Sequence, residues 1–246
     1  MPNLKKMKRM NYAEAWTFFM ENKRMGAPEA MDYLKYISRK TFVDDVRGKA
    51  IPFDELYKGG WLIIVDGVSC SGKTTTAKKI AEQFPETVEI IDIDYLFGAW
   101  LQREAEKIPN KEERKFFVKK AEKKGDEYLK LNLENLVENR AKEGKTIILV
   151  GCFLETIYRS IAGTVLGKYF EKVAIFTIYE EMETVNKYIE KRENTFGNPG
   201  GTLLAKQISE TSKQISFLKR VIDSQLFVLG FGADKSFIIN NETKLY

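Results

Sequence analysis

Glycines and small polar residues near position 70 have the types and spacing that bind phosphate groups. From Gly67 the sequence reads G-V-S-C-S-G-K-T, which matches the phosphate-loop pattern G-x-x-x-x-G-K-[ST]. Glycines in such a loop let consecutive backbone N–H groups point inward, where they hold phosphate oxygens. Lys73 can reach the β- and γ-phosphates of a nucleotide, and the Thr74 hydroxyl can bind Mg²⁺. We therefore expect a nucleoside triphosphate site, with the nucleotide contacted by Gly67, Ser69, Cys70, Ser71, Gly72, Lys73, Thr74 and Thr75.

The residues around this loop predict the strand and the helix that must hold it. Trp61 to Val65 is an apolar, β-branched run of strand length, and glycines precede it. After the loop, apolar residues recur with the spacing of one helix face, and Pro85 ends the run. These apolar positions are Ala77, Ile80, Ala81 and Phe84. A strand before the loop and an amphipathic helix after it are the context that the pattern requires, which disfavours a chance match.

Two carboxylates stand at the end of a second apolar run. Residues 88–93 read V-E-I-I-D-I and are followed by Asp94 and Tyr95. Asp92 and Asp94 are two positions apart, so their side chains would share one face if the extended geometry continued. In an open parallel sheet the ligand lies beyond the carboxyl ends of the strands, which would bring both acids toward the γ-phosphate. The alternative is that these aspartates only cap the next helix, a position that aspartate favours.

The composition is that of an ordinary globular protein of 246 residues, with 43% hydrophobic and 30% charged residues. The formal net charge of +5 permits a polyanionic partner without requiring one, because a nucleotide substrate explains it as well. No apolar run approaches the length of a membrane span, and no signal-peptide region follows the basic start. We therefore expect a cytoplasmic protein that has no membrane partner.

The chain contains no histidine, and its only cysteines are Cys70 and Cys152. The absence of histidine excludes Ser-His-Asp and Cys-His catalysis, histidine-ligated zinc and imidazole general bases. Two cysteines argue against a disulfide scaffold or a thiolate metal cluster. Proton transfer must therefore involve carboxylates, lysine, tyrosine or water.

Alternating strand and helix patterns predict an α/β fold. Further strands are expected at 145–150, 173–178 and 236–239, which would complete a mostly parallel, five-stranded sheet with helices on both faces. Residues 1–58 have helical patterns and are expected to form an N-terminal extension to a domain at 59–246. Residues 96–143 are helical and dense in charge, and we expect an insertion there. Their interleaved acids favour a solvated helix surface over a nucleic-acid track.

A basic pair precedes a glycine-rich segment in the second half of the chain. The helix expected over 180–192 ends in Lys191 and Arg192, and the residues that follow have loop composition as far as Gly201. This arrangement suits a lid, placed at 192–205, that closes over phosphates and excludes water. The alternative is a basic helix end that complements its own dipole.

These motifs resemble those of the P-loop kinases of small molecules and nucleotides, a group that includes nucleoside, nucleotide, shikimate, gluconate and adenylylsulfate kinases. The resemblance covers about residues 61–241 and rests on D-G-V-S-C-S-G-K-T-T, I-D-I-D-Y-L, the basic pair with its glycine-rich loop, and the late segment A-D-K-S-F-I-I-N-N. It implies a three-layer α/β/α P-loop fold in which Thr74 and Asp92 hold Mg²⁺. It also implies catalytic roles for Lys73, Asp94 and Arg192, and contact between Lys191 and the nucleotide phosphates.

The residues that would bind the phosphoryl acceptor have weaker sequence motifs than those that would bind the nucleotide. By the same resemblance Asp94 would orient or deprotonate the acceptor, although the sequence leaves open whether Asp92 or Asp94 is the base. Asp94, Tyr95 and Arg159 would contact the acceptor, but no motif places Arg159. The glycine-rich triplet of shikimate kinase and the acidic-Arg-Ser motif of deoxynucleoside kinases are missing from this chain. Acceptor choice would be decided by the N-terminal helices and the insertion at 96–143.

The resemblance implies that the γ-phosphoryl group of ATP is transferred to a small-molecule acceptor, with a nucleoside or nucleotide as the expected class. Two alternatives remain open at this point. One is a polynucleotide 5′-hydroxyl kinase, although nucleic acid is not the favoured partner. The other is a nucleotide-binding regulatory module without catalysis.

Overall fold

The computed structural model describes residues 43–52, 54–67, 70–151, 169–180, 182–196 and 234–246. Several sequence predictions lie outside these residues. They are the helices expected within residues 1–42, the lid beyond residue 196, and the single positions Ser69, Cys152 and Arg159.

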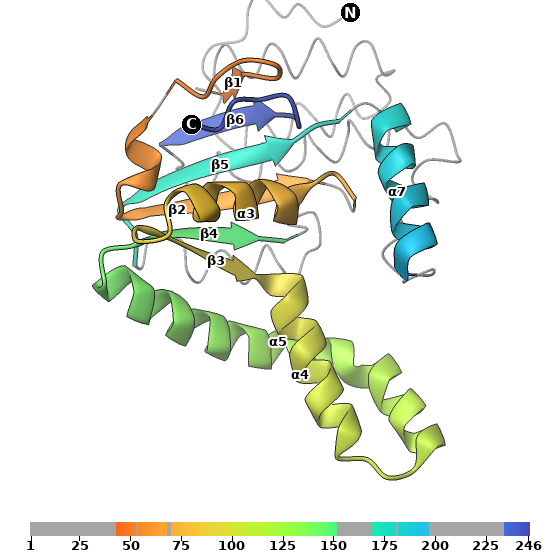
Figure 1. The fold of residues 1–246 in the computed structure, drawn as a ribbon. Helices are drawn as coiled ribbons and strands as arrows, with labels where there is room; N and C mark the ends of the chain where they lie inside the picture. Colours follow the sequence, from red (N-terminus) through yellow and green to blue (C-terminus); the bar gives the residue numbers. More distant parts are fainter. Residues whose placement is uncertain (1–42, 53, 68–69, 152–168, 181, 197–233) are drawn as a thin grey trace, which may run out of the picture.

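One sheet forms the centre of the fold (Figure 1). It has six strands in the order β1-β6-β5-β2-β4-β3, and every neighbouring pair is parallel. In chain order the strands are β1 (Val43–Asp45), β2 (Trp61–Gly67), β3 (Val88–Asp92), β4 (Thr146–Val150), β5 (Lys172–Ile178) and β6 (Lys235–Ile239). The expected parallel α/β architecture is confirmed.

The number of strands is six, not the five expected, because β1 was missed. This edge strand lies in the segment that was expected to be helical, and it pairs Asp44 with Phe237 of β6. It has three residues, two of them aspartates, so it carries neither the apolar run nor the alternation by which strands are recognised. Pairing with β6 therefore decides its conformation. Val43–Asp45 add to the sheet, which therefore extends into the range assigned to the N-terminal extension.

Helices cover both faces of the sheet, which gives the three layers. Alternate residues of β2 belong to different cores, as expected for a strand buried on both sides. Ile63 packs in the core that contains residues of α3 (Lys73–Gln83), whereas Leu62 packs in the core that contains residues of α5 (Lys111–Lys142). The short 3₁₀ helix η2 (Asp54–Tyr57) leads into β2.

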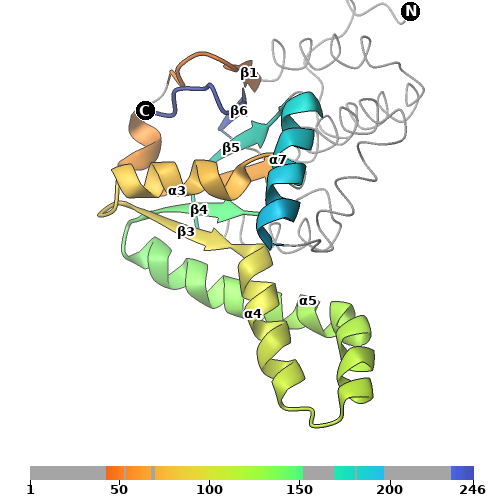
Figure 2. The same cartoon turned by 45° about the vertical axis from the view of Figure 1, so that its right-hand side comes forward.

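The two helices of the expected insertion form a hairpin beyond the edge strand β3 (Figures 1 and 2). α4 (Ile93–Glu106) and α5 pack through aromatic side chains, with the rings of Trp100 and Tyr128 stacked at 5.2 Å between centroids. Asn110 caps α5, since its Oδ1 accepts hydrogen bonds from the backbone N–H groups of Glu112 and Glu113. Helix α7 (Met182–Phe196) follows β5. Among the described residues, no helix combines the length and the apolar character needed to span a membrane.

The strand order places the carboxyl end of β2 near the middle of one edge of the sheet. β5 and β6 lie on one side of β2, whereas β4 and β3 lie on the other. The chain therefore leaves β2 toward β3 on one side and later builds β5 and β6 on the opposite side. Such a switch point leaves a crevice beyond the carboxyl ends of the strands, and this is where α/β proteins bind ligands.

Candidate functional site

The phosphate loop curls sharply between β2 and α3. Gly72, which precedes α3, has a φ angle of 96°, and Cys70 has a φ angle of 63°, so both lie in the left-handed region. A side chain at position 72 would be strained in that conformation. At Gly67 the reason for glycine is close approach, because a Cβ atom there would lie 2.6 Å from Ser71 Oγ and 3.0 Å from the Ile178 carbonyl oxygen. The loop therefore needs glycine at both ends of the motif.

Lys73 begins α3 and extends its side chain back across the loop. Its Nζ donates to the Gly67 carbonyl oxygen at 2.9 Å, and the residue is only 8% exposed. Ser71 Oγ is also buried, and it has no hydrogen-bond partner among the described residues. A buried hydroxyl without a partner costs about 1–3 kcal/mol, and a phosphate oxygen held in the loop would accept its hydrogen. The donors of the loop therefore fit a bound phosphate group.

Asp92 connects β3 to the phosphate loop. Its Oδ2 accepts a hydrogen bond from Thr74 Oγ1 at 3.0 Å, and its Oδ1 accepts one from the Tyr95 backbone N–H at 3.1 Å. The second bond makes Asp92 the N-cap of α4. The two interpretations offered for this residue are thus compatible, because one carboxylate oxygen caps the helix while the other faces Thr74. A hydroxyl and a carboxylate oxygen at this distance are the hard ligands that Mg²⁺ prefers, so the pair fits that ion.

Asp94 reaches the same pocket by a different route from the one expected. The extended geometry ends at Asp92, because α4 begins at Ile93. Asp94 lies in the first turn of α4, where a carboxylate also interacts favourably with the helix dipole. Asp94 and Tyr95 are both exposed, and Tyr95 is 75% exposed although its ring is large and aromatic. Both residues line the pocket.

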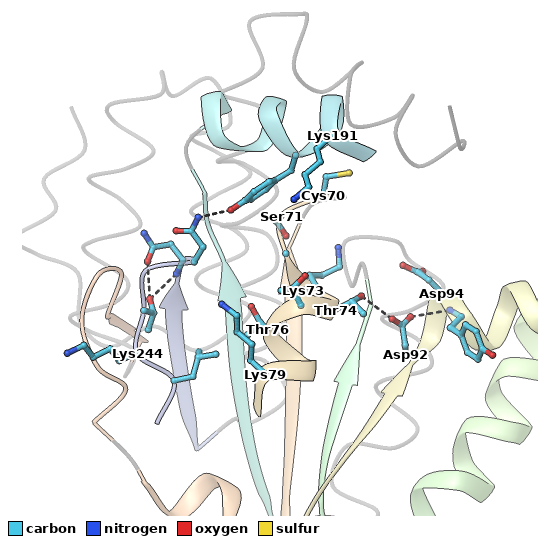
Figure 3. Close-up of a pocket in the computed structure, with 18 of the residues that line it drawn as sticks. Cys70, Ser71, Lys73, Thr74, Thr76, Lys79, Asp92, Asp94, Lys191 and Lys244 are labelled. Carbon is cyan, nitrogen blue, oxygen red and sulfur yellow. Dashed lines mark hydrogen bonds between the residues drawn. The ribbon is translucent and has the colours of Figure 1, made fainter. Parts of the chain in front are cut away.

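The pocket has a volume of about 800 Å³ and runs along the carboxyl edge of the sheet (Figure 3). The loop and α3, the end of β3 with α4, helix α7, and the segment after β6 each contribute to its lining. Figure 3 shows Lys191 of α7 beside Cys70, on the α7 side of the phosphate loop. The cations on the pocket lining are Lys73, Lys79, Lys191 and Lys244 within the described residues, and the anions are Asp92 and Asp94.

Residues 240–246, here called the C-terminal wall, close the pocket on the β6 side. Asn240 Oδ1 accepts from the Gly48 backbone N–H at 3.0 Å, and Tyr57 Oη donates to the Leu245 carbonyl oxygen at 2.6 Å. Burial raises the pKa of the Tyr57 hydroxyl far above its usual range, and Tyr246 adds a smaller contribution in the same direction. Tyr57 therefore stays protonated and remains a donor. These two bonds join the wall to residues that precede the phosphate loop in the chain.

Comparison with known proteins assigns the family. A family model described as an AAA domain matches residues 62–205, which is more than half of the chain. The chain belongs to this AAA-domain family. The match confirms the P-loop resemblance, and the observed architecture is the expected α/β P-loop NTPase fold. No curated protein matches the sequence.

The solved structures to which this AAA-domain protein is similar share little sequence with it. One comes from the PezAT chromosomal toxin–antitoxin system of Streptococcus pneumoniae (TM-score 0.44, 18% identity, covering 75% of this chain and 70% of that chain). Another is a gluconokinase from Sinorhizobium meliloti 1021 (TM-score 0.34, 17% identity, covering 70% and 95%). A third is shikimate kinase from Acinetobacter baumannii in complex with shikimate (TM-score 0.38, 11% identity, covering 74% and 84%).

The pocket of the AAA-domain protein brings together most of the residues that the sequence singled out. Those on its lining are Cys70, Ser71, Gly72, Lys73, Thr74, Thr75, Asp92, Asp94, Tyr95 and Lys191. Gly67 contributes the carbonyl oxygen that accepts from Lys73. Arg192 follows Lys191 on α7, but its side chain lies outside the described part of the structure, as do Ser69 and Arg159.

Sequence reasoning missed the C-terminal wall and the residues of α3 and α7 that share the pocket with it. These are Thr76, Lys79, Tyr188, Asn240, Asn241, Thr243, Lys244, Leu245 and Tyr246. One signal could have found part of the wall. An Asn-Asn pair directly follows the last apolar run, and polar residues at the carboxyl end of a parallel strand belong to the ligand-binding edge.

Proposed function

We propose that this AAA-domain protein is a kinase that transfers the γ-phosphoryl group of ATP to a hydroxyl or phosphate group of a small molecule, with a nucleoside or nucleotide as the first acceptor class to test. The observation that carries this proposal is the Thr74 to Asp92 hydrogen bond of 3.0 Å. It joins the phosphate loop to the acidic end of β3. The group that would bind the donor and the groups that would meet the acceptor therefore share one pocket.

The phosphate loop supplies positioning and charge. Lys73 and the backbone N–H groups of the loop would hold the β- and γ-phosphates, and release of the Lys73 side chain from the Gly67 carbonyl oxygen would free its Nζ to contact them. Phosphoryl transfer needs little covalent chemistry from the protein, since most of the rate comes from alignment and charge stabilisation. Ser71, whose hydroxyl is buried and faces no partner among the described residues, would donate to a phosphate oxygen.

Thr74 and Asp92 would hold Mg²⁺, Thr74 through its hydroxyl and Asp92 through Oδ2. When bound, the ion neutralises charge on the phosphate oxygens. Asp92 stays anchored for this task because its other oxygen accepts from the Tyr95 backbone N–H. The capping bond thus orients the carboxylate toward Thr74.

Asp94 and Tyr95 would receive the acceptor. Asp94 is exposed and lines the pocket, so its carboxylate would accept a hydrogen bond from an attacking hydroxyl and take its proton. Tyr95 offers an exposed aromatic face to a ring in the acceptor. Lys191, and Arg192 after it, would lie over the phosphates from the side of α7.

A panel assay tests the proposal. The protein with ATP and Mg²⁺ would be offered nucleosides, nucleotides, sugars and 5′-hydroxyl oligonucleotides, and phosphorylated product would be measured for each. We expect transfer to at least one small molecule. Transfer only to the oligonucleotide, with binding that weakens steeply as salt rises, would favour a polynucleotide kinase.

The variant Asp94→Asn sharpens the test, with Glu86→Gln as a matched control that removes a carboxylate exposed outside the pocket. Transfer by Asp94→Asn should fall by about 10²-fold or more, because a positioned acid–base group contributes that much, while ATP still binds. Glu86→Gln should keep the wild-type rate. An unchanged rate in Asp94→Asn would refute the role of Asp94, and no transfer to any acceptor would favour a regulatory module.

A further inference from the structure

The two ends of the pocket lie at different strands of the sheet, β3 and β6. β3 is two strands from β2 on one side, and β6 is two strands from β2 on the other. Adjacent strands lie about 4.8 Å apart, so the ends of β3 and β6 are each about 10 Å from the end of β2, in opposite directions. Figure 3 shows the same order, with Lys244, Lys73 and Asp94 following one another across the pocket. If the acceptor meets Asp94, the nucleoside part of the donor extends toward β6.

At the β6 end, Asn241 and Tyr188 form a polar pair that phosphoryl transfer does not use. Asn241 follows β6 and Tyr188 lies on α7, and both line the pocket. Asn241 Nδ2 donates to Tyr188 Oη at 2.7 Å. The backbone N–H of Asn241 donates to Oε1 of Glu180, a carboxylate that is 4% exposed. A buried carboxylate is tolerated only when it is hydrogen-bonded, and here its bond fixes an exposed residue of the wall.

Asn241 is therefore held at its backbone and at its side chain, which leaves a defined set of atoms for a ligand. With Nδ2 bound to Tyr188, the carboxamide Oδ1 is an acceptor that no donor among the described residues contacts. Tyr188 Oη accepts from Asn241 and keeps its own hydrogen to donate. The pair thus presents an acceptor next to a donor.

Nucleobases differ at the complementary positions. Adenine carries an amino group that donates beside a ring nitrogen that accepts, whereas a 6-oxopurine carries a carbonyl oxygen in place of the amino group. That oxygen would face the Asn241 oxygen, and two acceptors cannot form a hydrogen bond with each other. We propose that Asn241, with the Tyr188 hydroxyl, selects a nucleotide whose base bears an exocyclic amino group, adenine in particular, and rejects 6-oxopurines. This inference rests on the proposed function, because it assumes that the phosphates of the donor lie in the loop.

Equilibrium binding of ADP and IDP with Mg²⁺ tests the inference, because these nucleotides differ at the 6-position and the adjoining N1. Calorimetry on the full chain should show that ADP binds about 10-fold or more tightly than IDP, since a polar site rejects the analogue that leaves its groups unpaired. In Asn241→Leu this ratio should fall toward one while the affinity for inorganic tripolyphosphate is unchanged. Tyr188→Phe, which keeps the ring, should lower the ratio partly. Asn135→Leu, an exposed asparagine on α5 outside the pocket, is the matched control and should keep the wild-type ratio.

Equal binding of ADP and IDP by the wild type, or an undiminished ratio in Asn241→Leu, would overturn the inference. The proposed function can fail separately. A clear preference for ADP together with no phosphorylated acceptor would leave the base selection standing and refute the kinase, whereas phosphoryl transfer without base preference would do the reverse.

Discussion

The phosphate loop and the C-terminal wall line the same pocket, but they are built in opposite ways. In the loop, Lys73 contacts the carbonyl oxygen of Gly67, only six positions away along the chain. In the wall, Asn240 contacts Gly48 and Leu245 contacts Tyr57, across separations of 192 and 188 positions. The loop is shaped by its own glycines, whereas the wall exists only once distant parts of the chain have folded together.

This difference shows that substitutions in two parts of one ligand site can have different effects on binding and on stability. A substitution in the loop should remove binding and leave the fold intact, because the loop side chains meet the ligand. A substitution that loosens the wall should reduce stability and binding together, because the same bonds hold both. The following predictions test this contrast in order of expected effect.

The largest effect is expected from Lys73→Ala. Removing a positioned charge that stabilises the transferring group costs about 10²- to 10³-fold in rate, and ATP affinity should fall as well. The melting temperature should stay close to that of the wild type, since the hydrogen bond from Lys73 to Gly67 lies within the loop. Transfer rates, calorimetric ATP binding and a thermal melt would measure this. Lys78→Ala, an exposed lysine of α3 outside the pocket, is the control, and a large loss of stability in Lys73→Ala alone would break the contrast.

The sequence predicted the loop in detail because its signal is local. Glycine at positions 67 and 72 is required by close approach and by backbone conformation, and both requirements follow from the motif itself. The parallel sheet was also predictable, since its longer strands are apolar runs that can be recognised in the sequence. Asp92 lies within hydrogen-bond distance of Thr74, and its other oxygen caps α4. The spacing of residues in the sequence could not distinguish a helix cap from a metal ligand at this position.

The sequence could not predict β1 or the wall because neither carries a local pattern. β1 is three residues long and becomes a strand by pairing with β6. From the sequence alone, Asn240 would be assigned to a turn. Its hydrogen bond with the backbone N–H of Gly48, a residue distant in the sequence, is what makes it part of the pocket wall. The wall therefore illustrates how tertiary contacts decide the role of residues whose own propensities are neutral.

A smaller effect, on two properties at once, is expected from Asn240→Ala. The change leaves the Gly48 N–H without its acceptor and removes the bond from Thr243 Oγ1 at 3.0 Å. Because the first bond is exposed and the second is partly buried, their loss costs about 0.5–1.5 kcal/mol, and each kcal/mol lowers the melting temperature by about 2–4 °C in a chain of this size. The KM for ATP should rise, while kcat for bound substrate changes little. Asn139→Ala, on the exposed surface of α5, should change neither quantity. A raised KM without any loss of stability would show that the wall is not one cooperative unit.

The smallest effect is expected from Asp45→Asn on β1, and it should depend on pH. Burial by itself would raise the pKa of Asp45, but hydrogen bonds and the positive charge of Arg47, which lies 2.7 Å away, outweigh burial and hold that pKa below its usual value. The folded chain therefore binds this proton less readily than the unfolded chain does. The stabilisation is complete above the unfolded pKa and is lost as the pH falls through the folded one.

Thermal melts of wild type and Asp45→Asn should consequently differ near neutral pH by less than about 1 kcal/mol, because the pair is only partly buried. The gap should close as the pH falls below about 4, where the carboxyl group of the wild type becomes protonated. Asp44→Asn, which removes the exposed neighbouring carboxylate, should show no such closing gap. If the stability difference between wild type and Asp45→Asn stayed constant down to pH values below about 3, packing of the side chain and not its charge would stabilise β1. The C-terminal wall is hydrogen-bonded to residues that follow β1, among them Val46, Lys49 and Ile51. Its position would then depend on packing around β1 and not on the charge of Asp45.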